Sequence, residues 1–436
     1  MSEPLYSWGN FPDKPQSGHS SNWRGDLPQL MERVRGAHGV TLPYGNGRSY
    51  GDSCLASSDH VLRMRGLDRF IDADWEAGTV CAEAGITLAE ILAIAIPRGW
   101  FLAVTPGTQF VTLGGAIAND VHGKNHHVRG TFGKHVLSFG LLREGQSIVC
   151  SASSNVQLYG ATIGGLGLTG IISWACIQLI PIRASQINSS VVRFSNLAEF
   201  FSLSAELDHQ HEYSVAWIDC LAKGADTGRG VFIVGDHADF GSLDVGTRSK
   251  LRVPFTPPLS LINHLSLQAF NQAYWHVHPD KPKHVRGSYE PFFYPLDRIL
   301  HWNRVYGRRG FQQYQCVIPD AIADVAMHEV LATIAQAGHG SFLAVLKRCG
   351  DIKSPGLLSF PLPGASLALD FPQKQGLEKL FLQLDHIVHE AGGRLYPAKD
   401  AHMSGTDFRR AYPAWEQLEA LRDPSLNSHF WKRVTE

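Results

Sequence analysis

The spacing of apolar and polar positions divides the chain into two parts of different character. The first part consists mainly of short apolar runs separated by turn residues, a pattern typical of strands. A helix is expected after Thr87, because Thr87 and Glu90 have capping-box spacing and Pro97 stops the apolar run that follows. A second short helix is expected at 28–36. The predicted strands of this part lie at 40–42, 61–64, 70–73, 79–84, 136–142, 147–150 and 171–180.

From about residue 184 onward, strands and amphipathic helices alternate. The clearest helix covers 374–391, where apolar residues recur on one stripe and Gly392 and Gly393 follow the last turn. The other predicted helices lie at 197–209 and 321–337, and a polar helical tail closes the chain. The predicted strands lie at 191–194, 213–220, 231–235, 310–318, 341–347, 357–363 and 366–371. This mixture indicates a second, α+β domain that begins near residue 184.

Residues 240–290 interrupt that pattern with little periodicity and five prolines. A basic cluster lies here, next to Phe292, Phe293 and Tyr294, and consists of His276, His278, Lys281, Lys283, His284 and Arg286. Long irregular stretches inside a domain are usually lids, binding loops or disordered segments. Two interpretations stay open: a mobile lid that meets an anionic or amphipathic substrate, or a solvated loop.

Three glycine-rich stretches carry the candidate chemistry: 44–52, 106–127 and 160–170. Glycines let backbone approach a ligand, and successive N–H groups can form a nest for an anion. The stretch at 160–170 contains Gly165-x-Gly167-x-x-Gly170, the spacing of a dinucleotide fingerprint. That fingerprint requires a following helix, whereas the β-branched run after Gly170 reads as a strand. We therefore predict a cofactor that lies along loops rather than on a Rossmann helix.

Bulk composition excludes several classes of protein. With 436 residues, two domains are expected, and the formal net charge of −1 gives no basis for nucleic-acid binding. The N-terminus lacks the basic and apolar regions of a secretory signal, and the most apolar run, 86–104, is interrupted by charges and proline. The seven cysteines show no metal or redox spacing, which predicts buried reduced thiols of a cytoplasmic protein. Peripheral association with the inner membrane is left open.

The order of several motifs resembles that of one known family. These motifs are Tyr44-Gly-Asn-Gly-Arg-Ser-Tyr-Gly-Asp52, Pro106-Gly-Thr, Asp120-Val-His-Gly-Lys-Asn-His-His127, Gly164-Gly-Leu-Gly-Leu-Thr-Gly-Ile171, Pro291-Phe-Phe-Tyr-Pro-Leu-Asp297, Asp370-Phe-Pro372 and Tyr396-Pro-Ala-Lys-Asp400. Together they resemble the decaprenylphosphoryl-β-D-ribose 2′-oxidase family, within the vanillyl-alcohol-oxidase type of FAD-binding proteins. The resemblance implies an α+β fold: a PCMH-type FAD domain of two α+β subdomains at 1–183 and an inserted α+β substrate domain on an antiparallel sheet at 184–393. A C-terminal segment, 394–436, would return to the FAD domain.

The resemblance also implies a reaction. The 2-hydroxyl of a polyprenyl-phosphate-linked ribofuranose would be oxidised to a 2-keto sugar, with hydride passing to the flavin. A short-chain dehydrogenase/reductase partner would then reduce the ketone with inverted configuration, for synthesis of cell-surface arabinose glycans. Two alternatives are kept: a soluble sugar, alditol or aldonolactone oxidase of the same superfamily, and a non-catalytic FAD-binding protein.

Site residues follow from matching these motifs. The catalytic candidates are Lys399, His122 and Tyr50, because oxidising an alcohol needs a proton acceptor and positive charge near the flavin. The cofactor-binding candidates are Tyr44, Gly45, Asn46, Gly47, Arg48, Ser49, Tyr50, Gly51, Asp52, Pro106, Gly107, Thr112, Leu113, Gly114, Gly115, Asn119, His122, Gly123, Gly170, Ile171, Ile172 and Tyr396. The substrate-binding candidates are Lys124, Asn303, Gln313, Tyr314, Gln315 and Lys347; no metal is expected.

The chain departs from the family pattern at two positions. Arg48 stands where many members of the superfamily carry the histidine that attaches FAD, and a guanidinium group cannot form that bond, so the FAD is predicted to be noncovalent. Ala368 stands where the family has a cysteine that reacts with inhibitors. That cysteine is not needed for hydride transfer, so the change is expected to affect inhibitor sensitivity rather than catalysis.

Overall fold

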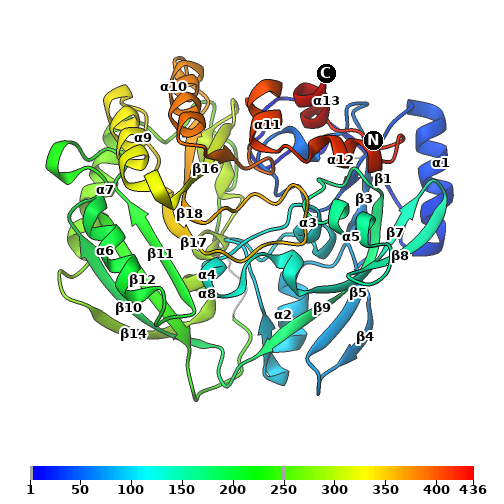
Figure 1. Ribbon diagram of the computed structural model, residues 1–436, viewed down its shortest axis with the longest axis horizontal. Helices are drawn as coiled ribbons and strands as arrows, with labels where there is room; N and C mark the ends of the chain where they lie inside the picture. The colour runs from blue at the N-terminus through cyan, green and yellow to red at the C-terminus, as the bar shows by residue number, and fades with distance from the viewer. Residues whose placement is uncertain (1–2, 247–250) are drawn as a thin grey trace.

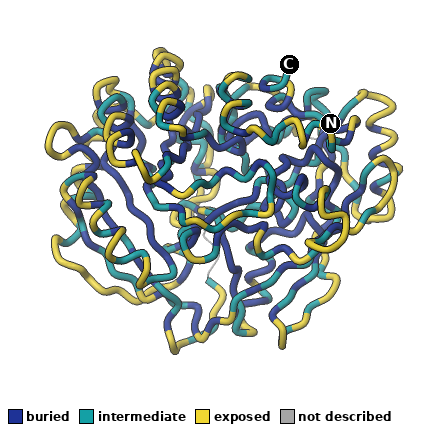
Figure 2. Tube along the Cα trace, viewed as in Figure 1, coloured by how far each residue is buried: buried dark blue, intermediate teal, exposed yellow. Residues whose placement is uncertain are grey.

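The computed structural model describes residues 3–246 and 251–436. Two large sheets lie side by side, and most helices are on their outer sides (Figure 1). The strands are largely buried, whereas the outward faces of the helices are exposed (Figure 2). This combination of helices with mainly antiparallel sheets belongs to the α+β class, as the sequence predicted.

The N-terminal part contains a small parallel sheet and a larger antiparallel one. The small sheet has the order β1 (Ser17–Ser20), β3 (His60–Arg63), β2 (Pro43–Tyr44). The larger has the order β4 (Phe70–Asp74), β5 (Thr79–Glu83), β9 (Ile171–Pro181), β7 (Val136–Arg143), β8 (Gln146–Ser151), with β6 (Trp100–Leu102) also paired to β9. Its helices are α1 (Leu27–His38), α2 (Leu88–Ala95), α3 (Leu113–Ala118), α4 (His126–Arg129) and α5 (Val156–Thr162).

Two sequence predictions in this part are confirmed. Thr87 caps α2 in a reciprocal capping box with Glu90, which fixes the start of the helix. Gly170 is followed directly by strand β9 and not by a helix, so the glycine spacing before it is not a Rossmann fingerprint.

The second part is built on an eight-stranded sheet. Its order is β14 (Lys283–Ser288), β10 (Gln186–Phe194), β12 (Gly230–His237), β11 (Tyr213–Ile218), β17 (Ala344–Cys349), β18 (Gly364–Pro372), β16 (Phe311–Pro319), β19 (Arg394–Leu395), with antiparallel neighbours. The helices here are α6 (Leu197–Leu207), α7 (His264–Val277), α8 (Tyr289–Phe293), α9 (Ala323–Ala337) and α10 (Leu377–Glu390). A separate pair joins β13 (Leu251–Arg252) to β15 (Ile299–Leu300).

Strand β16 connects this sheet to the site, because its side chains alternate between two faces. Tyr314 and Cys316 belong to the core under α9 and α10, and the ring of Tyr314 lies 5.2 Å from that of Phe381. Gln313 and Gln315 point to the opposite face, toward the N-terminal part. The face that carries these glutamines therefore forms one wall of the space between the two parts.

The C-terminal segment lies against the N-terminal part. It contains α11 (Gly405–Ala411), α12 (Trp415–Leu421) and α13 (His429–Thr435), which sit beside the N-terminal segments in Figure 1. Bridges join Thr41 to Leu426 and Ala56 to Ser428. This arrangement accords with the expected return of residues 394–436, although the exact domain limits stay a prediction.

Two sequence predictions of secondary structure are corrected. Residues 357–363 form no strand, because Pro361 and Pro363 cannot donate hydrogen bonds and Leu357 N–H donates instead to the carbonyl of Gly160 in the other part. The irregular stretch at 240–290 contains helix α7 and edge strand β14, whereas residues 247–250 of this predicted lid lie outside the described residues.

The prediction that all cysteines are reduced is wrong for one pair. Cys81 on β5 and Cys176 on β9 form a disulfide between directly paired positions of neighbouring strands. The spacing rule missed it because strand pairing brings together residues that are 95 positions apart. The cysteines therefore no longer support the predicted cytoplasmic location, which stays a prediction.

Candidate functional site

A cavity of about 2200 Å³, including the solvent at its mouth, lies between the two parts. Both glycine-rich loops, the inner face of the eight-stranded sheet and the segment before α11 line it. The predicted site residues in its wall are Gly45, Asn46, Gly47, Arg48, Ser49, Tyr50, Pro106, Gly107, Thr112, Gly114, Gly115, Asn119, His122, Gly123, Lys124, Gly170, Ile172, Gln313, Gln315, Lys347, Tyr396 and Lys399. The fold thus brings these separated motifs together at one place.

The first loop presents a run of backbone N–H groups to this cavity. In the part of the chain that the structure describes, the amides of residues 46–49 have no protein acceptor. Gly47 adopts a positive φ of 57°, which lets the chain turn within the loop. Consecutive unpaired amides of this kind form a nest for an anion such as a pyrophosphate group. The loop therefore fits the phosphates of FAD.

The second loop offers open backbone on the other side. A Cβ atom at Gly107 would meet nothing within 4 Å, so at that position the main chain itself borders the cavity. Thr112 begins α3 and accepts a hydrogen bond from Gly115 N–H, which fixes the bend of the loop. Both loops thus leave main chain accessible to a long, thin ligand.

Arg48 is buried in the wall of the cavity. Its guanidinium group lies 3.9 Å from the centre of the Trp8 ring and 5.8 Å from that of Phe110. Asp297 lies near it, accepting from Gln109 N–H, and burial raises the pKa of this carboxyl group to about 6. An arginine held in this way occupies the place where an attaching histidine would stand.

His122 has one free ring nitrogen in the cavity. The amide nitrogen of Gln315 lies 3.1 Å from Nε2 of His122, and an amide nitrogen can only donate, so the proton of a neutral ring lies on Nδ1. Among the described residues, Nδ1 has no partner. Burial, together with Lys347, His126 and Lys399, lowers the pKa of His122 far below its ordinary value. His122 is therefore a neutral hydrogen-bond donor that points Nδ1–H at a ligand.

Lys399 lies against Tyr50 and forms a buried pair of charges with Asp370. Its Nζ is 3.8 Å from the centre of the Tyr50 ring. Burial lowers the pKa of Lys399, and the charge of Asp370 opposes that shift. Burial raises the pKa of Asp370, whose Oδ1 accepts from Gln313 at 2.6 Å. Because burial also raises the pKa of Tyr50 well above 10, the phenol stays neutral and Lys399 is the better proton acceptor.

Two further lysines lie on the same side of the cavity. Lys347 donates to the carbonyl of Gly123 at 2.8 Å, and Lys124 donates to that of Phe292. Burial lowers the pKa of Lys347 to about 8 and that of Lys124 to about 7. Both amines become positive readily when an anion enters, which suits a phosphate-bearing substrate.

Several predicted contact residues lie behind the wall, and those predictions are corrected. Tyr314 points to the helical side of β16, where its hydroxyl donates to Asp385. Asn303 donates to the carbonyl of Trp8. The remaining positions absent from the wall are Tyr44, Gly51, Asp52, Leu113 and Ile171. In each case the motif was matched correctly in sequence, but alternation or close packing turns the side chain away from the cavity.

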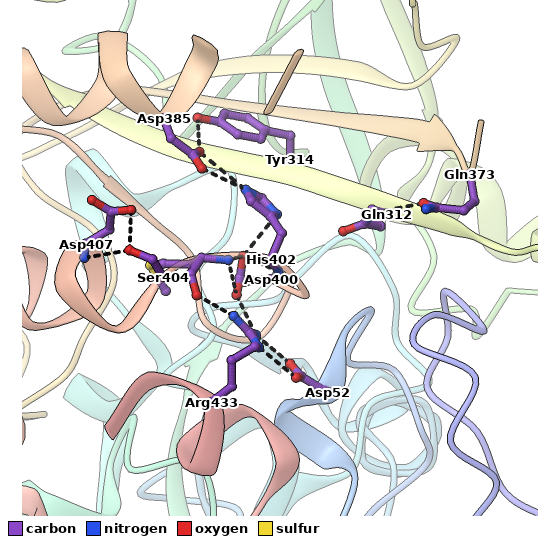
Figure 3. Close-up of polar contacts among 11 residues, drawn as sticks. Asp52, Gln312, Tyr314, Gln373, Asp385, Asp400, His402, Ser404, Asp407 and Arg433 are labelled. Atoms are coloured by element: carbon purple, nitrogen blue, oxygen red, sulfur yellow. Dashed lines mark hydrogen bonds and ion pairs between the residues drawn. The ribbon is translucent and has the colours of Figure 1, made fainter. Parts of the chain in front are cut away.

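Gly51 and Asp52 instead have structural roles. A Cβ atom at Gly51 would lie 1.7 Å from the carbonyl oxygen of Asp400, so only glycine permits this approach. Asp52 pairs with Arg433 of α13, which also binds Asp400 (Figure 3). His402 continues the network from Asp400 to Asp385. These charges hold the residue next to Lys399 against the first loop.

Sequence reasoning missed several wall residues. Trp8 lies in the N-terminal arm, where no periodic pattern or motif points to a site. Asp297 closes the motif 291–297, and an acidic residue ending an aromatic run was a usable signal. Ala368 lies in the wall on β18 beside Gln315, at the position where the family has a reactive cysteine.

Comparison with known proteins gives the site its chemical context. A family model for an FAD binding domain matches residues 25–151. Decaprenylphosphoryl-β-D-ribose oxidase of Mycolicibacterium smegmatis is 34% identical, and the match covers 96% of this chain and 94% of that protein. An uncharacterised protein of Streptomyces coelicolor is 33% identical over 78% of this chain. L-Gulonolactone oxidase of Mus musculus is 27% identical, but over only 36% of either chain.

FAD is thus the cofactor, and both the family and the FAD-domain fold class predicted from the motifs are confirmed. The matched region contains the two loops whose open backbone borders the cavity, so the comparison and the geometry agree on where the cofactor binds. The likeness extends through the second part, including Lys399. The chain belongs to the decaprenylphosphoryl-β-D-ribose oxidase family of FAD-dependent oxidoreductases.

Proposed function

We propose that this protein oxidises the 2-hydroxyl group of a polyprenyl-phosphate-linked D-ribofuranose to the 2-keto sugar. The observation that carries the proposal is the burial of Lys399 and His122 in the wall of one cavity, beside the nest formed by residues 46–49. The full-length relative supports the substrate class, since its name contains that sugar phosphate.

The reaction removes a proton from oxygen and a hydride from carbon. When bound, FAD supplies the hydride acceptor. Lys399 takes the hydroxyl proton, because burial lowers its pKa and makes the neutral amine accessible. His122 donates from Nδ1 to a sugar oxygen, and Gln315 holds the ring in that orientation. Lys347 and Lys124 provide positive charge for the phosphate group.

We further propose that the segment 240–300 binds the prenyl chain and a membrane surface. More than half of the exposed large hydrophobic side chains in the described residues lie in this segment, including Leu259 and Leu265, which are about three-quarters exposed. Its end, with Ile299 and Leu300, forms part of the cavity wall. None of the helices among the described residues has the length and apolar character needed to cross a bilayer.

Replacing Leu259 and Leu265 together by serine is expected to weaken binding to anionic vesicles about 100-fold. Each leucine that enters the acyl region contributes about 1.5–3 kcal/mol, and the two contributions add. Cosedimentation with phosphatidylglycerol vesicles measures the partition coefficient. Leu382→Ser is the matched control, because Leu382 is equally exposed but lies on α10. Equal loss in the control, or no loss in the double variant, would refute the proposed surface.

The 2-keto product requires a second enzyme if an arabino sugar is the end product. We infer a short-chain dehydrogenase/reductase partner that reduces the ketone from the opposite face. The alternative function is a soluble sugar, alditol or aldonolactone oxidase. It is favoured less, because the likeness to L-gulonolactone oxidase covers only about a third of the chain.

Anaerobic addition of polyprenyl-phosphoryl-ribose is expected to bleach the flavin absorbance within one turnover. Free ribose and aldonolactones should leave the spectrum unchanged at the same concentration, because they lack the phosphate for Lys347 and Lys124 and the lipid chain. Stopped-flow absorbance measures the rate. Faster bleaching by a lactone than by the lipid-linked sugar would establish the alternative function.

Acid precipitation is expected to release all of the flavin into the supernatant. The attaching histidine of other superfamily members is replaced by Arg48, which stays charged and is not a nucleophile. Absorbance of the supernatant and mass spectrometry of the intact chain measure free and attached flavin. A chain whose mass includes FAD would disprove noncovalent binding.

A further inference from the structure

Three histidines that take no part in the cavity gather at one end of the N-terminal part. They are His19 on β1, His38 at the last position of α1 and His60 at the first position of β3. One ring nitrogen from each lies within 4.8 Å of those of the other two. The three come from separate elements, so the tertiary fold rather than local sequence spacing brings them together.

The strand register determines how two of them meet. Strands β1 and β3 run parallel, and Ser17 is the register partner of His60. His19 lies two positions after Ser17, so both histidines lie on the same face of the sheet, one step apart. Nε2 of His19 is 3.0 Å from Nδ1 of His60. A single hydrogen bond can join these two nitrogens, but it leaves His38 unexplained.

The end of α1 brings in the third ring. Helix α1 packs on β1 and β3 (Figure 1), and it ends at His38 because Gly39 follows with a positive φ of 81°. The imidazole rings of His38 and His60 have centroids 3.4 Å apart and are tilted by 8°. His38 is exposed, so its ring can rotate out of this stack and turn a nitrogen toward the other two without moving the backbone.

The donor set indicates which ion would bind. Zinc forms bonds of about 2.0–2.1 Å to imidazole nitrogen in tetrahedral sites, which separates two such nitrogens by about 3.3 Å. The observed separations, from 3.0 Å to at most 4.8 Å, include that value. Neutral nitrogen donors suit zinc, copper and nickel, whereas calcium and magnesium require oxygen.

We propose that His19, His38 and His60 bind one divalent transition-metal ion of the zinc type, with the fourth position open to water. The ion would join β1, α1 and β3, which meet in the described structure only through packing and strand pairing. Strand β1 also anchors the N-terminal arm, whose Trp8 N–H donates to the carbonyl of Ser49 in the first loop. The site therefore secures the base of the arm that covers Arg48.

Titration of the chelator-treated full-length protein with zinc chloride tests the proposal. Isothermal calorimetry is expected to give one equivalent of zinc at micromolar concentration or tighter, and no magnesium binding. His38→Gln and His60→Gln should each weaken zinc binding at least about tenfold, because even loss of a partner outside the ligand set costs 10–100-fold. His209→Gln, at an exposed histidine on the other part of the chain, should leave the affinity unchanged.

A second measurement guards against misfolded variants and against the other histidines of the chain. Zinc should slow hydrogen exchange in 17–20 and 60–63 of the wild type, but not in His38→Gln, whose flavin content should match that of the wild type. Cobalt bound in place of zinc should give the visible spectrum of a tetrahedral ion. Zinc affinity that is equal in all variants, binding at millimolar concentration only, or unchanged exchange in these strands would each overturn the proposal.

Discussion

Lys399→Ala is expected to lower the rate of flavin reduction by substrate about 10²–10⁴-fold, the usual contribution of a positioned acid–base group. The side chain is buried in the cavity wall, over the ring of Tyr50 and in the field of Asp370. Truncating it removes the amine that takes the hydroxyl proton. Flavin content should stay near that of the wild type, because the pyrophosphate nest at residues 46–49 is unchanged. Anaerobic stopped-flow absorbance measures the reduction rate.

The pH dependence distinguishes proton transfer from simple charge stabilisation. Burial lowers the pKa of Lys399, so kcat/KM should rise with pH through an ionisation well below the ordinary lysine value of about 10.4. Lys399→Arg keeps the positive charge but cannot deprotonate, so this variant should stay slow at every pH. Lys379→Ala, at an exposed lysine of α10, is the control. Full activity in Lys399→Arg would assign a purely electrostatic role to Lys399.

Local sequence signals predicted secondary structure well wherever a physical rule acts over a few residues. The capping box at Thr87 and the glycines after α10 fix helix ends through short-range hydrogen bonds and backbone freedom. The strand after Gly170 was predicted because β-branched residues favour extended backbone. Segment 357–363 failed because its apolar residues pack across the gap between the two parts: Phe360 stacks on Tyr396 with centroids 4.7 Å apart.

The candidate site came from motif order, and its errors have one cause. Matching a motif places a residue near the site, but only the fold determines which way its side chain points. Gln313 and Gln315 lie in the wall and Tyr314 between them does not, because successive side chains of β16 alternate. Trp8 and the Cys81–Cys176 disulfide were missed for a related reason: each depends on contacts between segments that are distant in sequence.

Arg433→Ala is expected to lower the free energy of unfolding by about 3–5 kcal/mol, the cost of leaving a buried ion pair without one partner. Arg433 holds two carboxylates, Asp52 at 2.8 Å and Asp400 at 2.9 Å, whose side chains are 5% and 1% exposed. Without the guanidinium group both charges stay buried and unpaired. Urea denaturation followed by tryptophan fluorescence measures the loss. Lys432→Ala should stay within about 0.5 kcal/mol of wild type, because Lys432 forms only an exposed ion pair.

The size of this loss should depend on pH in a defined direction. Burial raises the pKa of Asp400, but Arg433 and His402 outweigh it and hold the pKa below its ordinary value of about 3.9. In the wild type this carboxylate therefore stabilises the fold above pH 4, and the contribution disappears as the pH falls through the folded pKa. In Arg433→Ala, protonation neutralises the unpaired carboxylates at a higher pH, so the difference between variant and wild type should shrink toward pH 4–5. A loss that is the same at pH 5 and pH 8 would mean that packing of the arginine side chain, rather than its charge, holds α13 against the first loop.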